Sequence, residues 1–399
     1  MADDPVPELN GRTPLETANK PYLDSMARRG ILGSVKTVPD GYAPGSDTAI
    51  MGIFGCAAEK YFAGRAPLEA AAQGVSLNPG DAAFRCNVAS VSDEGEYSAR
   101  TLLSHSAGGI GGEDARTIIE YLIADPGFAE LCSKARITLY PDNSYRQLCV
   151  QAQTDITGIV LYAPHDNWGK PVGEISPHGN PDAEILIELM KKSNEVLDHH
   201  PLNEERRAQG KLPANSIWFW AEGTAAALPN FKEQFGRTGA VVSAVPLCQG
   251  IGTLVGLEII RVEGATGELD TNYEGKVDAA IEALRRLDFA AIHVEAPDEC
   301  SHNGDIDGKL KSIEYLDSRV IGPVLERLGE SGEDFRVLVL SDHKTLLTTR
   351  MHDGTPVPFT IYDSRVDNAT GLGYTEAEAA SGKYLDAGPL LMAELFELT

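Results

Sequence analysis

Length, composition and charge exclude several classes of protein. The chain has 399 residues with 34 Lys plus Arg against 59 Asp plus Glu, and its formal net charge of −25 repels nucleic acid and anionic membranes. Such a length predicts two or three domains, and we expect a cytoplasmic protein with six reduced cysteines, because the cysteines are scattered, the first residues are acidic and no long apolar run is present.

The first predicted element that carries chemistry is a turn leading into a helix. In the segment Pro44-Gly45-Ser46-Asp47, Ser46 stands where a helix N-cap would stand, which is a purely structural role. A serine at a helix N-terminus can also hold a phosphate beside free backbone N–H groups and the positive end of the helix dipole. The two interpretations are compatible, and coordination to a divalent ion would turn this hydroxyl into a nucleophile.

The middle of the chain differs from the rest. Residues 80–182 contain short alternating pieces, such as 135–140 and 146–152, and few long apolar strands. We predict that 80–182 form an inserted, smaller α+β cap domain. The segments 1–79 and 183–399 then form one discontinuous catalytic domain.

Strands and helices alternate in the C-terminal half. Apolar runs predict buried strands, and helical spacing of apolar residues predicts helices between them. The predicted strands are 216–221, 289–294, 336–340 and 357–362, and the predicted helices are 276–287 and 310–328. This alternation predicts an α/β fold with a mostly parallel central sheet.

Two of these strands are followed by an acidic residue and a histidine. Asp298 and His302 follow the strand at 289–294, Asp342 and His343 follow the strand at 336–340, and His352 comes soon after. Ligands of open α/β sheets bind at the carboxyl ends of strands, and oxygen with imidazole ligands suits zinc or manganese. Each motif alone also fits an ordinary loop, but the five residues together predict a metal centre.

Motifs over nearly the whole chain resemble those of one family. The matching segments are 8–16, 44–47, 64–70, 84–87, 215–220, 264–267 and 270–276, together with the two metal motifs. They resemble the archaeal-type, 2,3-bisphosphoglycerate-independent phosphoglycerate mutases of the alkaline phosphatase superfamily. The resemblance implies a three-layer sandwich like that of alkaline phosphatase, with a mostly parallel central sheet and an inserted cap. It also implies that 3-phosphoglycerate and 2-phosphoglycerate are interconverted in glycolysis and gluconeogenesis without 2,3-bisphosphoglycerate.

The resemblance also assigns roles to the metal motifs. It implies that Ser46 carries a transient phosphate as the catalytic residue and contacts a metal ion. Asp298, His302 and His352 would hold one divalent ion, and Asp342 and His343 would hold the second beside Ser46. Manganese or zinc is the expected metal, with magnesium and cobalt as alternatives.

One feature of the family is absent from this sequence. The family has a buried strand ending in Asp-Gly ahead of the segment that starts here at Met1, and its Asp binds the second metal. The sequence has neither, and we assign that role to neither Asp3 nor Asp4. We expect that the first strand of the sheet is missing and that Met1 is an internal methionine of a longer reading frame; a chain starting at Met1 should be less stable and bind metal more weakly.

A cap that closes over the site should exclude water and grip the substrate carboxylate, for which arginine is well shaped. His165 and Asp166 would shuttle a proton between the glycerate hydroxyls, unless they form a simple turn. The candidate substrate-binding residues are Arg85, Arg146, His165, Asp166, Arg206 and Arg207. Arg85 and Arg146 are the better candidates among the arginines.

Other functions remain open at this stage. A related metal-dependent phosphotransferase, such as a homoserine kinase, would share the metal motifs, and so would a plain phosphatase. A non-catalytic binding protein is the third alternative, suggested by the missing metal ligand. The oligomeric state is not predicted.

Overall fold

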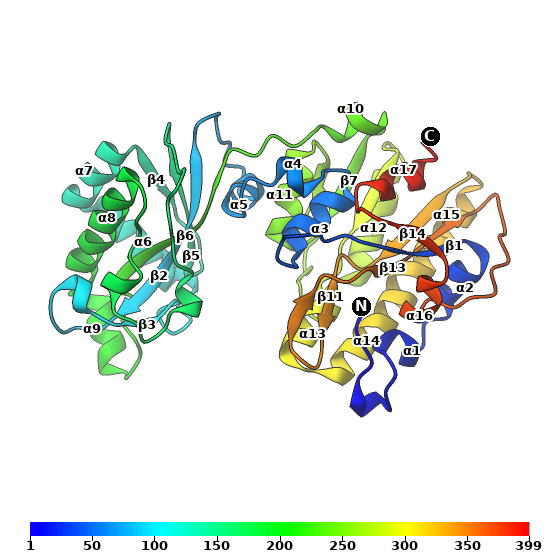
Figure 1. Ribbon diagram of the computed structural model, residues 1–399, viewed down its shortest axis with the longest axis horizontal. Helices are drawn as coiled ribbons and strands as arrows, with labels where there is room; N and C mark the ends of the chain where they lie inside the picture. The colour runs from blue at the N-terminus through cyan, green and yellow to red at the C-terminus, as the bar shows by residue number, and fades with distance from the viewer. Residues whose placement is uncertain (399) are drawn as a thin grey trace. The chain divides into compact units, whose positions relative to one another are not determined.

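The computed structural model describes residues 1–398 and contains two compact units. The first unit comprises Met1–Phe62 and the chain from Ala227 to its end, and the second comprises Ala63–Ala226. Figure 1 shows the elements of both units. No helix among the described residues combines the length and the apolar character that crossing a membrane requires.

The second unit extends beyond the predicted insertion at 80–182 on both sides. The strand β6 (Ser216–Thr224) pairs antiparallel with β2 (Ala82–Val91), and the helix α5 (Ala66–Ala72) packs on both strands. The apolar pattern alone predicts that the strand at 216–221 belongs to the catalytic domain with the later strands. This prediction is wrong, because the sequence of a short buried strand does not reveal which strand it pairs with. Long-range pairing therefore sets the unit boundary.

The first unit has two main sheets. One has the order β8-β7-β9 and is parallel throughout, whereas the other has the order β10-β13-β1-β14. Its pairs β10–β13 and β1–β13 are antiparallel, and only β1–β14 is parallel. The strands are β1 (Ile31–Val35), β7 (Gly239–Val242), β8 (Glu258–Ile260), β9 (Phe289–Ile292), β10 (Arg336–Leu340), β13 (Val357–Asp363) and β14 (Lys383–Leu385).

The prediction of one mostly parallel sheet therefore needs correction. Parallel neighbours require a long crossover, usually a helix. Between β10 and β13 the chain forms only the hairpin of β11 (Lys344–Leu346) and β12 (Met351–Asp353), so β13 returns antiparallel. The fold is mixed α/β with several sheets.

Helices of the first unit pack against these sheets. Helix α12 contacts β7 and β9, while α2 and α16 contact β1 and β13. The helices are α1 (Pro14–Thr17), α2 (Pro21–Arg29), α3 (Ser46–Ile53), α4 (Ala58–Tyr61), α10 (Phe231–Phe235), α11 (Pro246–Leu254), α12 (Tyr273–Leu284), α13 (Ala296–Asn303), α14 (Ile306–Leu316), α15 (Gly322–Ser331), α16 (Glu376–Ala380) and α17 (Leu390–Phe396). A π-helical turn, Asp317–Ile321, joins α14 to α15 where one helix was predicted.

A cavity separates the two sheets of the first unit. It has a volume of about 710 Å³ and is lined by residues 287–295 of the β9 region and 333–343 of the β10 region. Each of these strands is paired on one side only, β9 with β7 and β10 with β13. Their other edges therefore carry backbone groups without a strand partner in the described part of the chain.

The N-terminal segment of the first unit is anchored by a buried ion pair. Lys309 Nζ lies 2.7 Å from Asp3 Oδ2, and the two side chains are 1% and 0% exposed. Asp3 also accepts a hydrogen bond from the backbone of Leu347. A carboxylate held in this way has a structural role.

Breaking this pair should destabilise the protein strongly. We expect Lys309→Met to lower the free energy of unfolding by about 3–5 kcal/mol, because it leaves an unpaired buried carboxylate. Adding Asp3→Asn should recover part of that loss, as measured in a urea double-mutant cycle. Asp4→Asn is the matched control: Asp4 pairs with Lys344 but is half exposed, so its loss should cost less than about 1 kcal/mol. The prediction would be wrong if Lys309→Met cost no more free energy of unfolding than Asp4→Asn.

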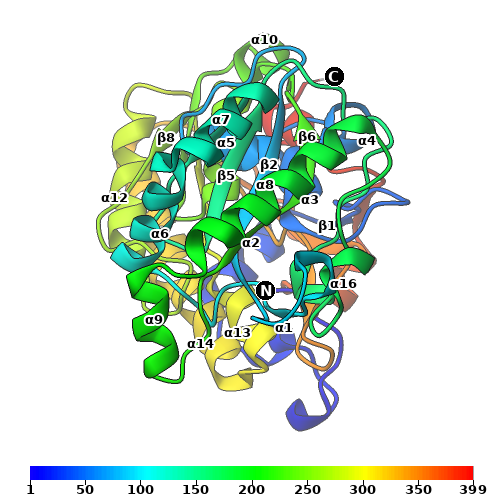
Figure 2. The same cartoon turned by 90° about the vertical axis from the view of Figure 1, so that its left-hand side faces the viewer.

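The second unit is built on an antiparallel sheet. Strand β2 pairs with β6 on one side and β5 on the other, β5 pairs with β4, and β3 joins the end of β2. Helices α6, α7 and α8 cover one face of this sheet (Figure 2). The further elements are β3 (Leu102–Ser104), α6 (Gly112–Ala124), α7 (Pro126–Ala135), β4 (Ile137–Tyr140), β5 (Arg146–Gln151), α8 (Pro181–Leu197) and α9 (Pro201–Ala208).

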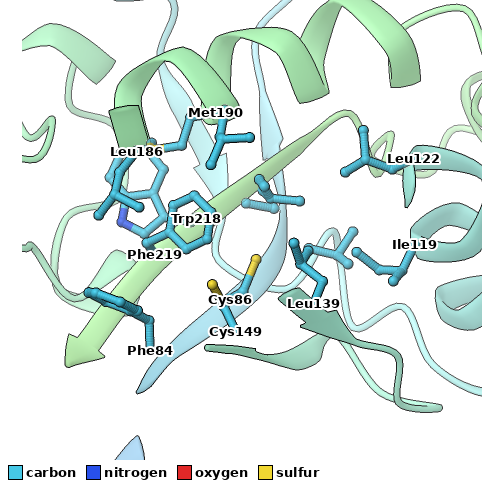
Figure 3. Packing of buried hydrophobic residues seen from close by; sticks show 14 of the residues in the cluster. Phe84, Cys86, Ile119, Leu122, Leu139, Cys149, Leu186, Met190, Trp218 and Phe219 are labelled. Atoms are coloured by element: carbon cyan, nitrogen blue, oxygen red, sulfur yellow. The ribbon is translucent and has the colours of Figure 1, made fainter. Parts of the chain in front are cut away.

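The core of this unit lies between the sheet and the three helices. Figure 3 shows Trp218 and Phe219 of β6 packed beside Met190 of α8. Cys86 and Cys149 lie in the same core as free thiols, and burial raises the pKa of both. Cys86 and Cys149 are thus packing residues of this core.

Candidate active site

Ser46 opens helix α3 and faces an imidazole. Its Oγ lies 3.0 Å from Nε2 of His343. The N-cap of α3 is Gly45 and not Ser46, which corrects the predicted capping role. The Ser46 side chain therefore contacts His343 instead of capping the helix, and it lies at a helix end that favours anions.

The three histidines share one hydrogen-bonding pattern. In each ring Nδ1 lies near a backbone carbonyl: His302 near Arg350 O at 2.9 Å, His343 near Lys344 O at 3.1 Å and His352 near Pro44 O at 3.3 Å. A carbonyl only accepts, so each Nδ1 carries the proton and each Nε2 keeps its lone pair in the neutral ring. This is the arrangement that metal-binding histidines adopt.

The lone pairs of two of these rings point at each other. Nε2 of His302 lies 2.8 Å from Nε2 of His352, although two lone pairs at that distance repel. A proton or a cation between them removes the repulsion. Asp298 supplies the compensating negative charge, with carboxylate oxygens 3.2 Å from His302 Nε2 and 3.5 Å from His352 Nε2.

Asp298, His302 and His352 together form a ligand set for one divalent ion. Their ligand atoms all lie within 4.8 Å of one another. Two imidazoles and a carboxylate suit zinc or manganese. These three residues therefore fit the divalent metal ion that the sequence motifs imply.

Asp342 and His343 lie beside this set. Asp342 Oδ2 is 3.4 Å from His343 Nε2, and the rings of His343 and His352 lie 4.0 Å apart. The structure thus brings Ser46 and all five predicted ligands into one cluster, built from helix α13, the turn that follows β10, the start of α3 and the hairpin β11–β12. Metal binding at each of them remains a prediction.

Charge effects keep the two aspartates ionised. Burial acts to raise the pKa of Asp298, but a hydrogen bond from the protonated form of His352 and one from Thr345 overcome it and hold that pKa well below the usual range. At Asp342 burial is likewise outweighed, by the positive charge that His343 carries in its protonated form and by the Ser46 hydrogen bond, so its pKa is lowered. The pKa of His352 is raised, because the Asp298 contact outweighs burial. Such a site attracts cations.

Two of the predicted substrate residues lie around one tryptophan in the second unit. Arg85 donates from Nε to Glu69 at 2.8 Å, forms a second bond to the same carboxylate, and lies over the ring of Trp220, 4.8 Å from its centroid. The ring of His165 lies 5.0 Å from that of Trp220. Arg85 is thus rigidly held, with much of its charge balanced by Glu69.

Arg146 lies beside a chain of aromatic rings in the second unit that includes His105. Its guanidinium lies 5.0 Å from the Tyr145 ring, and Tyr145 in turn packs 5.5 Å from His105. His105 stacks on Trp168, whose indole N–H donates to His105 Nδ1 at 3.1 Å. Burial, then the nearby charges of His165 and Arg146, lower the pKa of His105. A neutral histidine and an exposed arginine here could bind a small anion.

The remaining predicted residues differ in their availability. Arg206 is buried and donates to the carbonyls of Leu212 and Ala107, while Arg207 donates to Asp198 and Asp93. Both guanidinium groups are engaged within their own unit, so we exclude these two arginines from the substrate site. Asp166 is exposed, 3.7 Å from His165 Nε2, and stays a candidate.

Sequence reasoning missed several residues around both clusters. Thr345 donates from its hydroxyl to Asp298. Trp220 packs against Arg85, and His105 packs against Tyr145 beside Arg146. The run Ser216-Ile217-Trp218-Phe219-Trp220 is a local signal for Trp220, since its residues alternate in direction along a strand. No local signal indicates Thr345, whose partner lies 47 positions away.

Comparisons with known proteins agree along almost the whole chain. A family model described as 2,3-bisphosphoglycerate-independent phosphoglycerate mutase matches residues 27–203. The protein of that name from Methanosarcina barkeri is 44% identical over 388 residues, covering 96% of this chain and 93% of the relative. Its counterpart in Methanothrix thermoacetophila is 44% identical over 384 residues, covering 96% and 94%.

Solved structures show the same fold. A protein from Pyrococcus horikoshii superposes with a TM-score of 0.79 at 31% identity, covering 100% of this chain and 94% of the other. The cofactor-independent phosphoglycerate mutase of Thermoplasma acidophilum superposes with a TM-score of 0.67 at 25% identity, covering 100% and 96%. Both matches span the two units.

Proposed function

The chain belongs to the 2,3-bisphosphoglycerate-independent phosphoglycerate mutase family, and we propose that it interconverts 3-phosphoglycerate and 2-phosphoglycerate through a phosphorylated Ser46. The observation that carries this proposal is the cluster of Ser46 with Asp298, Asp342 and three histidines. A serine beside a ligand set for divalent ions is what phosphoryl transfer requires.

The residues have separate tasks. Asp298, His302 and His352 would hold one divalent ion, and Asp342 and His343 a second. Bound there, the ions would neutralise charge on the phosphoryl oxygens and lower the pKa of the Ser46 hydroxyl. Manganese and zinc fit the donor set best, with magnesium and cobalt as alternatives.

Ser46 acts as the acceptor and then the donor of the phosphoryl group. Its Oγ gives up its proton and attacks phosphorus as the bond from phosphorus to the 3-oxygen of glycerate breaks, and that oxygen takes up a proton. Glycerate then presents its 2-hydroxyl, which gives up its proton as its oxygen attacks the phosphoserine. The bond from phosphorus to Ser46 Oγ breaks, and Oγ takes up a proton to restore the hydroxyl. The helix N-terminus at Ser46 supports the charge of the phosphorylated residue.

Residues of the second unit would hold the glycerate part. Arg146 is exposed and suited to a carboxylate, Arg85 is fixed by Glu69 beside Trp220, and His165 with Asp166 could carry the proton between the two hydroxyls. A cap function for this unit would exclude water from the phosphoserine. Without that exclusion the protein would release inorganic phosphate.

One assay separates this function from its alternatives. The purified protein, supplied with manganese, should convert 3-phosphoglycerate to 2-phosphoglycerate without added 2,3-bisphosphoglycerate, and release inorganic phosphate far more slowly. Phosphate as the main product would indicate a phosphatase. ATP-dependent phosphorylation of homoserine without interconversion would indicate a kinase, and ion binding without turnover a binding protein.

The cavity between β9 and β10 supports a proposal for one further strand in this unit. The amide of Ala2 donates to Ser341 Oγ at 3.1 Å, so Met1 lies at the carboxyl end of β10 and lines the cavity. A segment leading into Met1 through the cavity would run parallel to both strands. One extended strand there would satisfy both free edges and join the two sheets.

Supplying that strand should stabilise the protein. We expect about five Val and Ile residues, enough at ~3.3 Å per residue to span β10, to raise Tm by roughly 5 °C or more when attached ahead of Met1. Amides of β9 and β10 should gain protection from hydrogen exchange. The same extension with two prolines is the control, because proline cannot pair on both sides. Equal behaviour of the two extensions would contradict the proposal.

A further inference from the structure

Thr345 occupies a central position between the two candidate ion sites. It lies on β11, where it is directly opposite His352 on β12, and only 4% of its surface is exposed. His343 of the second site lies two positions before it in the sequence, so Thr345 lies beside a proposed ligand of each site. Neither the sequence motifs nor the family comparisons assign it a role.

The Thr345 hydroxyl contacts one ligand from each site. It donates to Oδ1 of Asp298, which belongs to the first set. It also lies 3.3 Å from Nδ1 of His343, which belongs to the second. A hydroxyl has one proton, so while donating to Asp298 it can only accept from His343.

A second contact of His343 Nδ1 agrees with this assignment of donor and acceptor. Nδ1 of His343 also faces the carbonyl of Lys344 at 3.1 Å, and a carbonyl cannot donate. The ring therefore carries its proton on Nδ1 and shares it between two acceptors. Nε2 of His343 is left unprotonated at 3.0 Å from Ser46 Oγ.

A hydrogen bond from a buried lysine fixes the backbone of Thr345. Lys309 Nζ donates to the carbonyl of Thr345 at 2.8 Å and is itself paired with Asp3. All three residues are buried. The hydroxyl is thus held at a defined place, which a residue that orients ligands needs.

We propose that Thr345 is a positioning residue that couples the two ion sites, by fixing the Asp298 carboxylate and the His343 tautomer with one hydroxyl. The inference rests on the proposed two-ion function, but it concerns ion binding and not turnover. It implies that the affinities for both ions depend on a single side chain. A residue that only filled space would not have that effect.

Two substitutions separate positioning from packing. Thr345→Val keeps the shape and removes the hydroxyl, and we expect it to weaken binding of both manganese ions by about 10–100-fold. Thr345→Ser keeps the hydroxyl and should bind both ions close to wild-type strength. Thr360→Val is the matched control: Thr360 is a buried strand residue whose hydroxyl has no partner within residues 1–398.

Manganese is titrated into the full chain without substrate, and its binding is measured by calorimetry and by paramagnetic resonance. Cobalt absorption spectra give a second readout, since a misoriented His343 changes the ligand field. Thermal unfolding in a chelator checks that each variant is folded. Support requires both ions to be weakened in Thr345→Val and rescued in Thr345→Ser.

Two results would overturn the inference. One is wild-type manganese binding and an unchanged cobalt spectrum in Thr345→Val. The other is equal loss in the Val and Ser variants, which would indicate packing alone. The manganese titrations contain no substrate, so they test the role of Thr345 independently of turnover. If the Val and Ser variants bind manganese as expected but the wild-type protein fails the mutase assay, only the proposed function is contradicted.

Discussion

Replacing Ser46 with alanine should lower kcat for phosphoglycerate interconversion by roughly 10⁴-fold or more, the range seen when a nucleophile is removed. The reason is that no other hydroxyl stands at 3.0 Å from His343 Nε2 within the described residues. The fold should be unaffected, because Gly45 and not Ser46 caps helix α3. We expect a change of less than about 0.5 kcal/mol in the free energy of unfolding.

The measurement combines steady-state kinetics with mass spectrometry of the rapidly quenched enzyme. Wild-type protein with 3-phosphoglycerate should carry one phosphoryl group on the peptide containing Ser46, and the Ala variant none. Thr48→Val is a matched control, because it removes a hydroxyl from the same turn, where the Thr48 hydroxyl donates to the carbonyl of Gly45. A Ser46→Ala enzyme with a tenth of wild-type activity would show that Ser46 is not the nucleophile.

The second large effect is expected at Asp298. Asp298→Asn keeps the size of the side chain but removes the charge that faces His302 and His352. We expect the variant to lose about one divalent ion per chain after dialysis. Turnover should fall roughly 10³-fold, since an ion at the phosphoryl oxygens contributes several kcal/mol to the transition state.

Ion content by plasma mass spectrometry and turnover on the same samples test this expectation. Asp307→Asn is the control, because it removes a carboxylate from an exposed position on the adjacent helix α14. Excess manganese should restore part of the activity of Asp298→Asn. If the variant kept both ions and still lost activity, Asp298 would act on the substrate instead of on a metal.

The sequence by itself determined the family, the chemistry and the residue types of the site. Asp298 with His302, and Asp342 with His343, follow apolar runs that form β9 and β10, and that local order is readable because a strand end and its ligands are adjacent in the chain. The start of helix α3 at Ser46 was predicted within one residue. The N-cap was misassigned because Gly45 has an extended backbone that no side-chain pattern reveals.

Only the tertiary structure decided how these pieces meet. The gap between β9 and β10, the antiparallel return of β13 and the pairing of β6 with β2 all depend on contacts between residues far apart in sequence. The engagement of Arg206 and Arg207, and the link from Thr345 to Asp298, depend on them as well. The periodicity of apolar residues indicates which side of a segment is buried, but not which other segment it packs against. A local pattern therefore cannot specify these partners.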